Sequence, residues 1–374
     1  MILNVLIAPD KFKGTLSARA AADAMARGWR LARPADHVVP FPISDGGDGF
    51  GELVGASLAA TTETVRTVDA AHQPCAAEWW WEPQSRTAII EAARVNGLAR
   101  LPAGKYHPFD LDTFGLGALM VSAQAKGALR CLVGIGGSAT NDGGFGMARS
   151  LGWSFFDEHG TGIERWTDLL SLSHCQPPPT PRWPKEILVA VDVQNPFLGP
   201  SGCSRIYGPQ KGLREPDFER AERCLGRLAE VMGRQLHSDL ANEPGTGAAG
   251  GLGFGLRSFL GARLAPGFGL FADHTGLRER LSAADLVVTG EGAIDSSTLM
   301  GKGVGELALL CRQAKKPCLG LGGVVPDRAA AAKVFTRTYA LTPDFTDRET
   351  AFAKAEESLA RLAEQASAAW SQRG

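Results

Sequence analysis

The stretch from Cys131 to Gly146, CLVGIGGSATNDGGFG, constrains the fold more than any other part of the sequence. An apolar run leads into glycines and small polar residues, and a helix-like pattern resumes at Met147, which predicts a strand, a loop and a helix. Glycines allow positive φ angles and let successive backbone N–H groups point at one anion, while the helix N-terminus adds partial positive charge. The stretch therefore predicts a phosphate-binding loop. Taken alone, a tight turn without a ligand is an equally good interpretation.

Composition and charge argue against several classes of partner. The chain has 374 residues, of which 44% are hydrophobic, so it is long enough for two domains with cores of their own. Its net charge of -1 favours neither nucleic acid nor an anionic membrane. No segment approaches the roughly 18 apolar residues of a membrane span. The apolar N-terminus is too short for a signal peptide.

The seven cysteines are scattered along the chain and never have CxxC spacing. This pattern is typical of reduced thiols in a cytosol and not of a disulfide framework or a zinc site. We therefore expect a cytoplasmic protein.

The first predicted strand, Ile2 to Ala8, is followed at once by charged residues. Asp10, Lys11 and Lys13 come next in the sequence, before a helix that Ser17 is expected to cap. Open α/β sheets bind ligands at the carboxyl ends of their strands. We therefore expect these side chains to contact a ligand, against the alternative that they are solvated loop charges.

The second predicted strand, His37 to Pro42, leads into the loop ISDGGDGF. Asp45 and Asp48 flank a glycine pair there, and a helix is expected from near Glu52. Carboxylates on a flexible loop suit Mg²⁺, which takes one or two carboxylates together with water and phosphate oxygens. A plain Asp-Gly turn is the alternative. Asp45 is the better candidate because it lies nearer the end of the strand.

Two later strands also end in polar residues. Glu186 to Val191 predicts a buried strand that delivers Asp192 and Asn195 into a long Gly- and Pro-rich loop, which closes with Lys211. A predicted strand of four residues after Asp285 delivers acidic and basic side chains among glycines, namely Gly290, Glu291, Gly292, Asp295 and Lys302. Acids and a lysine in such a setting are hard to explain by packing.

The middle of the chain has a different character. From Thr64 to Trp81 the residues alternate as in antiparallel strands, and Trp79 and Trp81 share a face that we expect either to be buried or to lie at a domain interface. We predict an α/β protein with a doubly wound, Rossmann-like domain at 1–72 plus 285–374. A second α/β domain with Gly-rich loops is expected as an insertion at 73–284, with a cleft between the two.

Several predicted strands end in acidic residues, glycines and lysines. This pattern favours an enzyme that transfers a phosphoryl group. That reaction needs charge neutralisation and positioning by a metal, lysines and backbone N–H groups, and a carboxylate that orients the attacking hydroxyl. The P-loop and protein-kinase motifs are absent. GIGGSA lacks the spacing of a dinucleotide-binding loop, so a nicotinamide enzyme is disfavoured.

Six ordered motifs resemble the class I glycerate kinases, the bacterial glycerate 2-kinase family. They are APDKFKGTLSA, PISDGGDGF, GIGGSATNDGG, DVQNP with GPQKG, GTGAAGGLG and GEGAIDSSTLMGKG, and the likeness runs from Ile2 to about Val325. The resemblance implies ATP-dependent phosphorylation of D-glycerate, at the 2-hydroxyl, with Mg²⁺. The chain departs from the family pattern at Asp48, Phe50 and Leu116.

Roles for individual residues follow from their charge within this resemblance. The expected catalytic residues are Asp192 as the base, Asp45 as the alternative base, and Lys11 and Lys13. The expected substrate contacts are Asp10, Ser138, Asn141, Asp142, Asn195 and Lys211. Nucleotide binding is expected at Gly136, Gly137, Gly290, Gly292 and Lys302, and metal binding at Glu291 and Asp295.

Two other functions fit the same residues. One is a kinase for another small hydroxy acid, and the other is a sensor that binds a sugar acid or a nucleotide without catalysis. The expected partners are D-glycerate and ATP, with no nucleic acid and no membrane, for a protein that is a monomer or a homodimer.

Overall fold

The chain forms two compact units in the computed structural model, which describes residues 1–299 and 302–371. The first unit, unit 1, comprises Met1–Asp45 and Phe271–Gly374, and the second, unit 2, comprises Gly46–Leu270. Unit 1 is thus discontinuous in sequence. Helix α9 (Gly267–Thr275) contains the second crossing point. Within the described residues, no helix combines the length and the apolarity that a membrane span requires.

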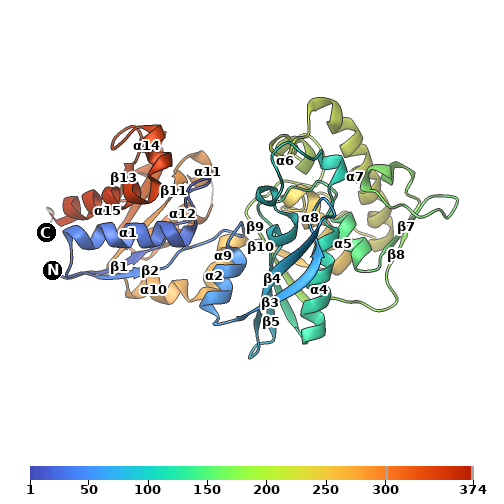
Figure 1. Cartoon of the computed structure of the whole chain (residues 1–374), viewed down its shortest axis with the longest axis horizontal. Coiled ribbons are helices and arrows are strands. Elements are labelled where there is room, and N and C mark those ends of the chain that lie inside the picture. The colour runs from blue at the N-terminus through green and yellow to red at the C-terminus, as the bar shows by residue number, and fades with distance from the viewer. Residues whose placement is uncertain (300–301, 372–374) are drawn as a thin grey trace. The chain divides into compact units, whose positions relative to one another are not determined.

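Unit 1 is built on a parallel sheet of five strands in the order β13-β12-β11-β1-β2. Counted along this unit alone, the order is 2-1-3-4-5, a doubly wound arrangement whose switch point lies between β1 and β11. Figure 1 shows the blue strands β1 and β2 and the orange strand β11 in this sheet. The elements are β1 (Asn4–Ile7), α1 (Ala18–Ala32), β2 (His37–Pro40), α10 (Leu277–Ala283), β11 (Leu286–Ala293), α11 (Ser296–Leu299), α12 (Gly303–Gln313), β12 (Cys318–Val324), α13 (Arg328–Ala331), β13 (Arg337–Ala340), α14 (Arg348–Ala353) and α15 (Ala355–Ser371).

Helices cover both faces of this sheet, as a doubly wound fold requires. Ser17 caps α1 by accepting a hydrogen bond from the backbone N–H of Ala20, as predicted. Helices α1 and α15 share one core with alternate residues of β1, including Val5 and Ile7. Leu6 is buried as well, so the opposite face is also covered. Helix α12 contacts β11 and β12, and its buried residues lie outside the core of α1 and α15.

Unit 2 contains a mixed sheet in the order β10-β9-β6-β5-β4-β3. Strands β3, β4 and β5 pair antiparallel, whereas β5, β6, β9 and β10 pair parallel. A two-stranded sheet of β7 and β8 lies apart from it. The elements are α2 (Phe50–Ser57), β3 (Thr61–Val68), β4 (Pro74–Glu82), β5 (Thr87–Glu91), α3 (Ala93–Asn96), α4 (Phe114–Lys126), β6 (Arg130–Gly134), α5 (Phe145–Ser150), β7 (Ser154–Phe156), β8 (His174–Gln176), β9 (Glu186–Val191), α6 (Cys203–Lys211), α7 (Glu215–Leu236), α8 (Ala248–Leu260) and β10 (Arg263–Pro266).

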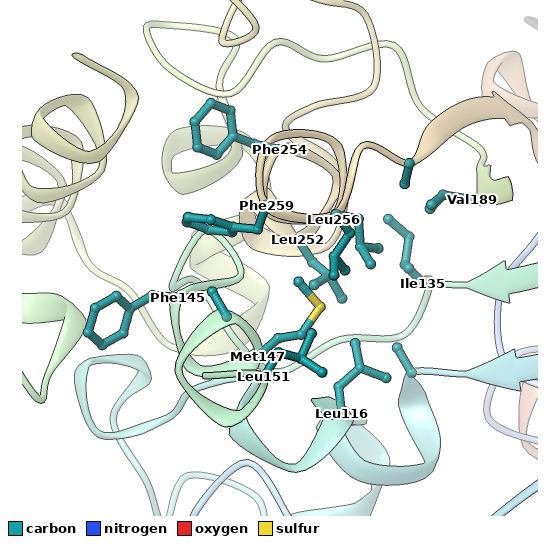
Figure 2. Packing of buried hydrophobic residues seen from close by; sticks show 14 of the residues in the cluster. Leu116, Ile135, Phe145, Met147, Leu151, Val189, Leu252, Phe254, Leu256 and Phe259 are labelled. Atoms are coloured by element: carbon teal, nitrogen blue, oxygen red, sulfur yellow. The ribbon is translucent and has the colours of Figure 1, made fainter. Parts of the chain in front are cut away.

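The three consecutive tryptophans of β4 divide between the two faces of this sheet. Trp79 and Trp81 are buried in the core that contains α4, α5 and α8, which confirms the expected burial. Trp80 points the other way, against Gly51 and Gly55 of α2. The main core is built from hydrophobic residues, and Figure 2 shows side chains of α4, α5 and α8 converging in it.

The compact units have bounds other than the predicted domains at 1–72 plus 285–374 and at 73–284. The first crossing falls between Asp45 and Gly46, because α2 packs on β4 and β5, and β3 pairs with β4 over its whole length. Helix α2 and strand β3, which the prediction assigned to the first domain, therefore belong to unit 2. The predicted doubly wound domain with an inserted α/β domain is confirmed as a fold class.

Two local predictions need correction. The stretch after Asp192, predicted as one long loop, contains α6. Strand β11 is longer than the four residues predicted, so Glu291 lies within the strand instead of after it. Of the motif GEGAIDSSTLMGKG, Met300 and Gly301 lie outside the described residues.

We predict that Gly28→Ala lowers the free energy of unfolding by about 1–3 kcal/mol. A Cβ at Gly28 in α1 would lie 1.8 Å from the carbonyl oxygen of Ala360 in α15, so the two helices would have to move apart. Gly226→Ala in α7 is the matched control, because the nearest atom to its Cβ is 3.9 Å away. The control should gain up to about 1 kcal/mol from helix propensity. Chemical denaturation measures both, and equal midpoints for the two variants would contradict this packing.

Candidate functional site

The predicted acidic residues of unit 1 gather at the switch point of its sheet. The backbone N–H of Asp10, after β1, donates to the carbonyl of Gly290 in β11, with an N–O distance of 2.9 Å. The first residue of α12 lies beside them. A Cβ placed on Gly303 would lie 3.4 Å from the Cβ of Asp45 and 3.7 Å from Oδ2 of Asp10. Sheet pairing and the start of α12 therefore hold two of these carboxylates together.

Burial and mutual repulsion disturb the titration of this group. Burial, and then the charge of Asp45, raises the pKa of Asp10 to about 8. Burial likewise raises the pKa of Glu291 to about 7, with further contributions from Asp45 and Asp295. These carboxylates lack enough positive charge nearby to be fully ionised at neutral pH. A bound cation would supply the missing charge.

The loop after β11 fixes the orientation of two of the acids. Thr298 donates its hydroxyl to Oε1 of Glu291 over 2.7 Å. Ser297 donates both its backbone N–H and its hydroxyl to Oδ1 of Asp295, which holds the pKa of Asp295 below its usual value. Lys302 lies close enough to favour the charged forms of Glu291 and Asp295. One lysine therefore faces two acids where α12 begins.

The loop after β1 is a tight turn that presents the two predicted lysines. Phe12 is buried, and its backbone exchanges hydrogen bonds with Leu16. Lys11 and Lys13 flank this anchor, and Lys11 contributes positive charge next to Asp10. A Cβ at Gly292 would lie 3.5 Å from the backbone nitrogen of Lys13, so the turn passes over β11.

Gly290, one of the two predicted glycines of β11, has a packing role in the structure. A Cβ at Gly290 would lie 2.1 Å from the carbonyl oxygen of Leu321 in β12, so only glycine fits. The role of Gly290 and Gly292 in nucleotide binding stays a prediction.

The acidic residues fit a magnesium ion by their chemistry. Mg²⁺ prefers hard oxygen ligands and takes only one or two carboxylates from the protein. Glu291 and Asp295 each accept protein hydrogen bonds at one oxygen, which leaves the other oxygen for an ion. In residues 1–299 and 302–371, no set of three or more His, Cys, Asp or Glu side chains is arranged to hold a metal. Glu291 and Asp295 therefore suit a cation that completes its coordination with phosphate oxygens and water.

In unit 2, the Gly-rich loop after β6 uses many of its own amides within the chain. The N–H of Gly136 donates to the carbonyl of Gly46, and the N–H of Ala139 donates to that of Asn96. The N–H of Gly143 donates to Gly250. Fewer backbone amides of this loop are thus open to an anion than the sequence indicated. An anion at this loop would have to use the amides of 137, 138 and 140–142.

Gly137 lies where two loops meet closely. Its φ is +78°, and a Cβ there would collide with Oδ1 of Asp48 at 1.8 Å. Glu91 at the end of β5 accepts hydrogen bonds from the N–H groups of Gly49 and Gly51, each over 3.1 Å, and so holds the loop that carries Asp48. The sequence reasoning missed Glu91, although an acid directly after an apolar strand was a signal for it.

Asp142 is fully buried and accepts hydrogen bonds from residues at the starts of two helices. Its Oδ2 accepts hydrogen bonds from the N–H and hydroxyl of Thr113, before α4, and from the N–H of Gly146 in α5. Burial, and then the charge of Asp112, raises the pKa of Asp142 to about 6. Donors from the protein thus occupy both carboxylate oxygens of Asp142. Its role as a substrate contact stays a prediction that this geometry does not favour.

Lys211 at the end of α6 reaches back to the Gly-rich loop. Its Nζ donates to Oγ of Ser138 over 2.9 Å and to the carbonyl of Thr140 over 2.7 Å. Burial lowers the pKa of Lys211 to about 8. Asn141 is held from the same helix, because its Nδ2 donates to Oγ of Ser204 over 2.9 Å. Oδ1 of Asn141 is buried and has no hydrogen-bond partner among the described residues.

The loop after β9 places Asp192 and Asn195 beside α6. Nδ2 of Asn195 donates to the carbonyl of Ser201 over 2.8 Å. The hydroxyl of Tyr207 donates to Oδ1 of Asn195 over 2.5 Å. Asp192 follows the last residue of β9, is exposed, and lies near enough to Tyr207 to affect its titration. Ser204 and Tyr207 were missed because the sequence reasoning took this stretch for a loop.

The glycerate kinase family model matches residues 5–371 of this chain. The chain belongs to the glycerate kinase family.

Curated relatives agree with this assignment. A glycerate 2-kinase of Escherichia coli (strain K12) is 36% identical over 332 residues, which cover 87% of this chain and 86% of the relative. A glycerate kinase of Bacillus subtilis (strain 168) is 34% identical and covers 96% of both chains. A crystal structure described as glycerate kinase 2 from Salmonella typhimurium LT2 has a TM-score of 0.82 and 32% identity, over 100% of this chain and 99% of that one. As a member of the family, the chain is a kinase and therefore an enzyme.

Two residues that depart from the glycerate kinase pattern, Phe50 and Leu116, are buried among apolar neighbours. Phe50 at the start of α2 is buried, and its ring lies against Gly134. Leu116 of α4 is buried beside Met147 and Leu151, as Figure 2 shows. Leu116 belongs to the main core of unit 2, whereas Phe50 is buried outside that core.

We predict that Lys211→Met changes how the stability of this glycerate kinase depends on pH. The pKa of Lys211 falls from 10.5 to about 8 on folding, so between these values the unfolded chain binds more protons. The stability of the native chain relative to the variant should therefore rise from pH 8 to 10.5, by on the order of 3 kcal/mol.

Denaturant titrations at several pH values measure this difference. Lys126→Met, which removes a lysine from an exposed ion pair with Glu63, is the control. The burial of Lys211 as a charged group would be contradicted by a difference that stays constant across this pH range.

Proposed function

We propose that this chain transfers the terminal phosphoryl group of ATP to D-glycerate and releases 2-phosphoglycerate and ADP, with Mg²⁺ as the metal. The family supports glycerate as the acceptor. A kinase needs a nucleotide donor, for which ATP is the proposed molecule. The 2-hydroxyl is proposed because a relative at 36% identity carries the name glycerate 2-kinase. The observation that carries the proposal is the group of Asp10, Asp45 and Glu291 beside Lys302 at the switch point of unit 1.

Unit 1 is proposed to handle the phosphates. Glu291 and Asp295 would hold Mg²⁺, which supplies charge neutralisation at the phosphoryl oxygens when bound. Lys302 at the start of α12 would contact nucleotide phosphates, where the helix N-terminus adds to its charge. Lys11 and Lys13 would bind the glycerate carboxylate or the transferred phosphate. The raised pKa of Asp10 is consistent with a site that receives positive charge together with its ligands.

Unit 2 is proposed to hold the hydroxy acid. Asp192 at the end of β9 would accept the proton of the 2-hydroxyl as its oxygen forms a bond to the terminal phosphorus. The bond from that phosphorus to the bridging oxygen breaks, and ADP leaves with the electron pair. Asn195, Ser138 and Asn141 would contact the acid, and Lys211 fixes the loop that carries the latter two. Asp45 is the alternative base.

We also propose that the enzyme acts in the cytoplasm. All seven cysteines are thiols in the structure, and six of them are buried. Reduced thiols are the usual state of cysteines in that compartment.

The test of the proposed function is ADP release with D-glycerate, L-glycerate and tartronate as acceptors, followed by phosphorus NMR of the product. We expect turnover with D-glycerate, a phosphate on the 2-oxygen, and loss of activity when Mg²⁺ is chelated. Binding of glycerate without ADP release would show a sensor. Preference for another acceptor would show a different hydroxy-acid kinase.

We predict that Asp192→Asn lowers kcat by about 10²-fold or more and changes the KM for D-glycerate little. The amide keeps the shape of the side chain but cannot accept the hydroxyl proton. Asp168→Asn, which removes an exposed charge elsewhere in unit 2, is the control and should keep normal kinetics. Steady-state kinetics measure both variants. A kcat for Asp192→Asn within twofold of the native value would move the base role to Asp45.

A further inference from the structure

Helix α6 presents three polar side chains on one face. Ser204, Tyr207 and Lys211 are three and four residues apart, which places them on the same side of the helix. Ser204 and Lys211 bind the loop after β6, through Asn141 and Ser138. Tyr207 alone of the three binds the loop after β9, through Asn195. The helix thus connects the two loops that carry the proposed glycerate contacts.

The hydrogen bonds of Asn195 determine which way its side-chain amide points. The carbonyl of Ser201 can only accept, so the atom that faces it must be the nitrogen Nδ2. Oδ1 therefore faces Tyr207, and Tyr207 must be the donor in that bond. The backbone is fixed as well, because the carbonyl of Asn195 accepts a hydrogen bond from the N–H of Gly247. Each part of Asn195 has one allowed orientation.

One N–H hydrogen of Asn195 is left over in this arrangement. Nδ2 carries two hydrogens, and the carbonyl of Ser201 is its acceptor among the described residues. Asn195 is three residues from Asp192, and Asp192 lies near Tyr207. The remaining N–H is thus a donor on the same loop as the proposed base. A hydroxy acid has the oxygen atoms that such a donor needs.

We infer that Tyr207 is a positioning residue that locks the Asn195 amide, so that Nδ2 donates a hydrogen bond to an oxygen of D-glycerate. This inference rests on the proposed function, which places the hydroxy acid at Asp192 and Asn195. Without the tyrosine hydroxyl, Oδ1 loses its donor, and the side-chain amide keeps only its hydrogen bond to the carbonyl of Ser201. A side chain held by one hydrogen bond instead of two moves more freely, so the Nδ2 donor would be presented to substrate only part of the time.

The protonation of Tyr207 supports its role as a constant donor. Burial, and then the charge of Asp192, raises the pKa of Tyr207 to about 12. The hydroxyl therefore keeps its proton over the whole range in which the enzyme can be assayed. Its hydrogen is committed to Asn195, so it does not neutralise Asp192 by donating to that carboxylate.

The experiment compares Tyr207→Phe, Asn195→Ala and the double variant in the coupled assay. We expect Tyr207→Phe to raise the KM for D-glycerate about fivefold, with kcat and the KM for ATP nearly unchanged. Asn195→Ala should raise that KM by about tenfold or more, because the donor itself is lost. The double variant should match Asn195→Ala, since Tyr207 acts only through Asn195. Tyr106→Phe, which removes a hydroxyl elsewhere in unit 2, should be unaffected.

The possible outcomes separate the inference from the proposed function. If Asn195→Ala leaves the KM for glycerate unchanged, the proposed placement of the acid fails and the inference fails with it. If Asn195→Ala is impaired while Tyr207→Phe behaves like the native enzyme, only the positioning role of Tyr207 is overturned. Additive effects in the double variant, or a change confined to the KM for ATP, also overturn it. Thermal unfolding of each variant checks that a raised KM does not come from loss of the fold.

Discussion

Parallel pairing between β1 and β11 is the contact on which unit 1 depends. Val5, Leu6 and Ile7 lie opposite Leu286, Val287 and Val288, although about 280 residues separate the two strands in sequence. This register places Asp10 beside Gly290 and so beside Glu291. A slip by one residue would turn the side chains of β1 to the wrong face of the sheet. The charge group at the switch point is therefore a product of strand register as much as of its own side chains.

Unit 2 shows a different use of buried polarity. Asp142 and Lys211 are removed from water, and each is compensated by hydrogen bonds to loop backbone and hydroxyl groups. Burial of such groups costs stability unless every partner is in place. The result is a set of loops with few alternative conformations. A kinase benefits from this because phosphoryl transfer depends mainly on positioning.

Local signals made much of the fold predictable from sequence. The apolar run Glu186–Val191 and the Ser17 cap of α1 gave strand and helix bounds that agree with the structure. Helix α6 was missed because Gly202 and Pro209 are typical of loops, and Pro209 lies inside the helix, where proline has no backbone N–H to donate. The domain crossing at Asp45 was missed because it depends on which sheet β3 joins. Periodicity also cannot show which carbonyl each amide of the Gly-rich loop binds. The sequence therefore suggested more amides open to an anion than the structure has.

The discontinuity of unit 1 has a consequence for the order in which the chain folds during synthesis. Residues 46–270 form a contiguous unit, so all of it can emerge and fold while β1 and β2 still lack their partner β11. Until β11 has been synthesised, the first 45 residues therefore expose an unpaired edge of β1. That edge is only four residues long, which limits the opportunity for wrong pairing with a neighbouring nascent chain.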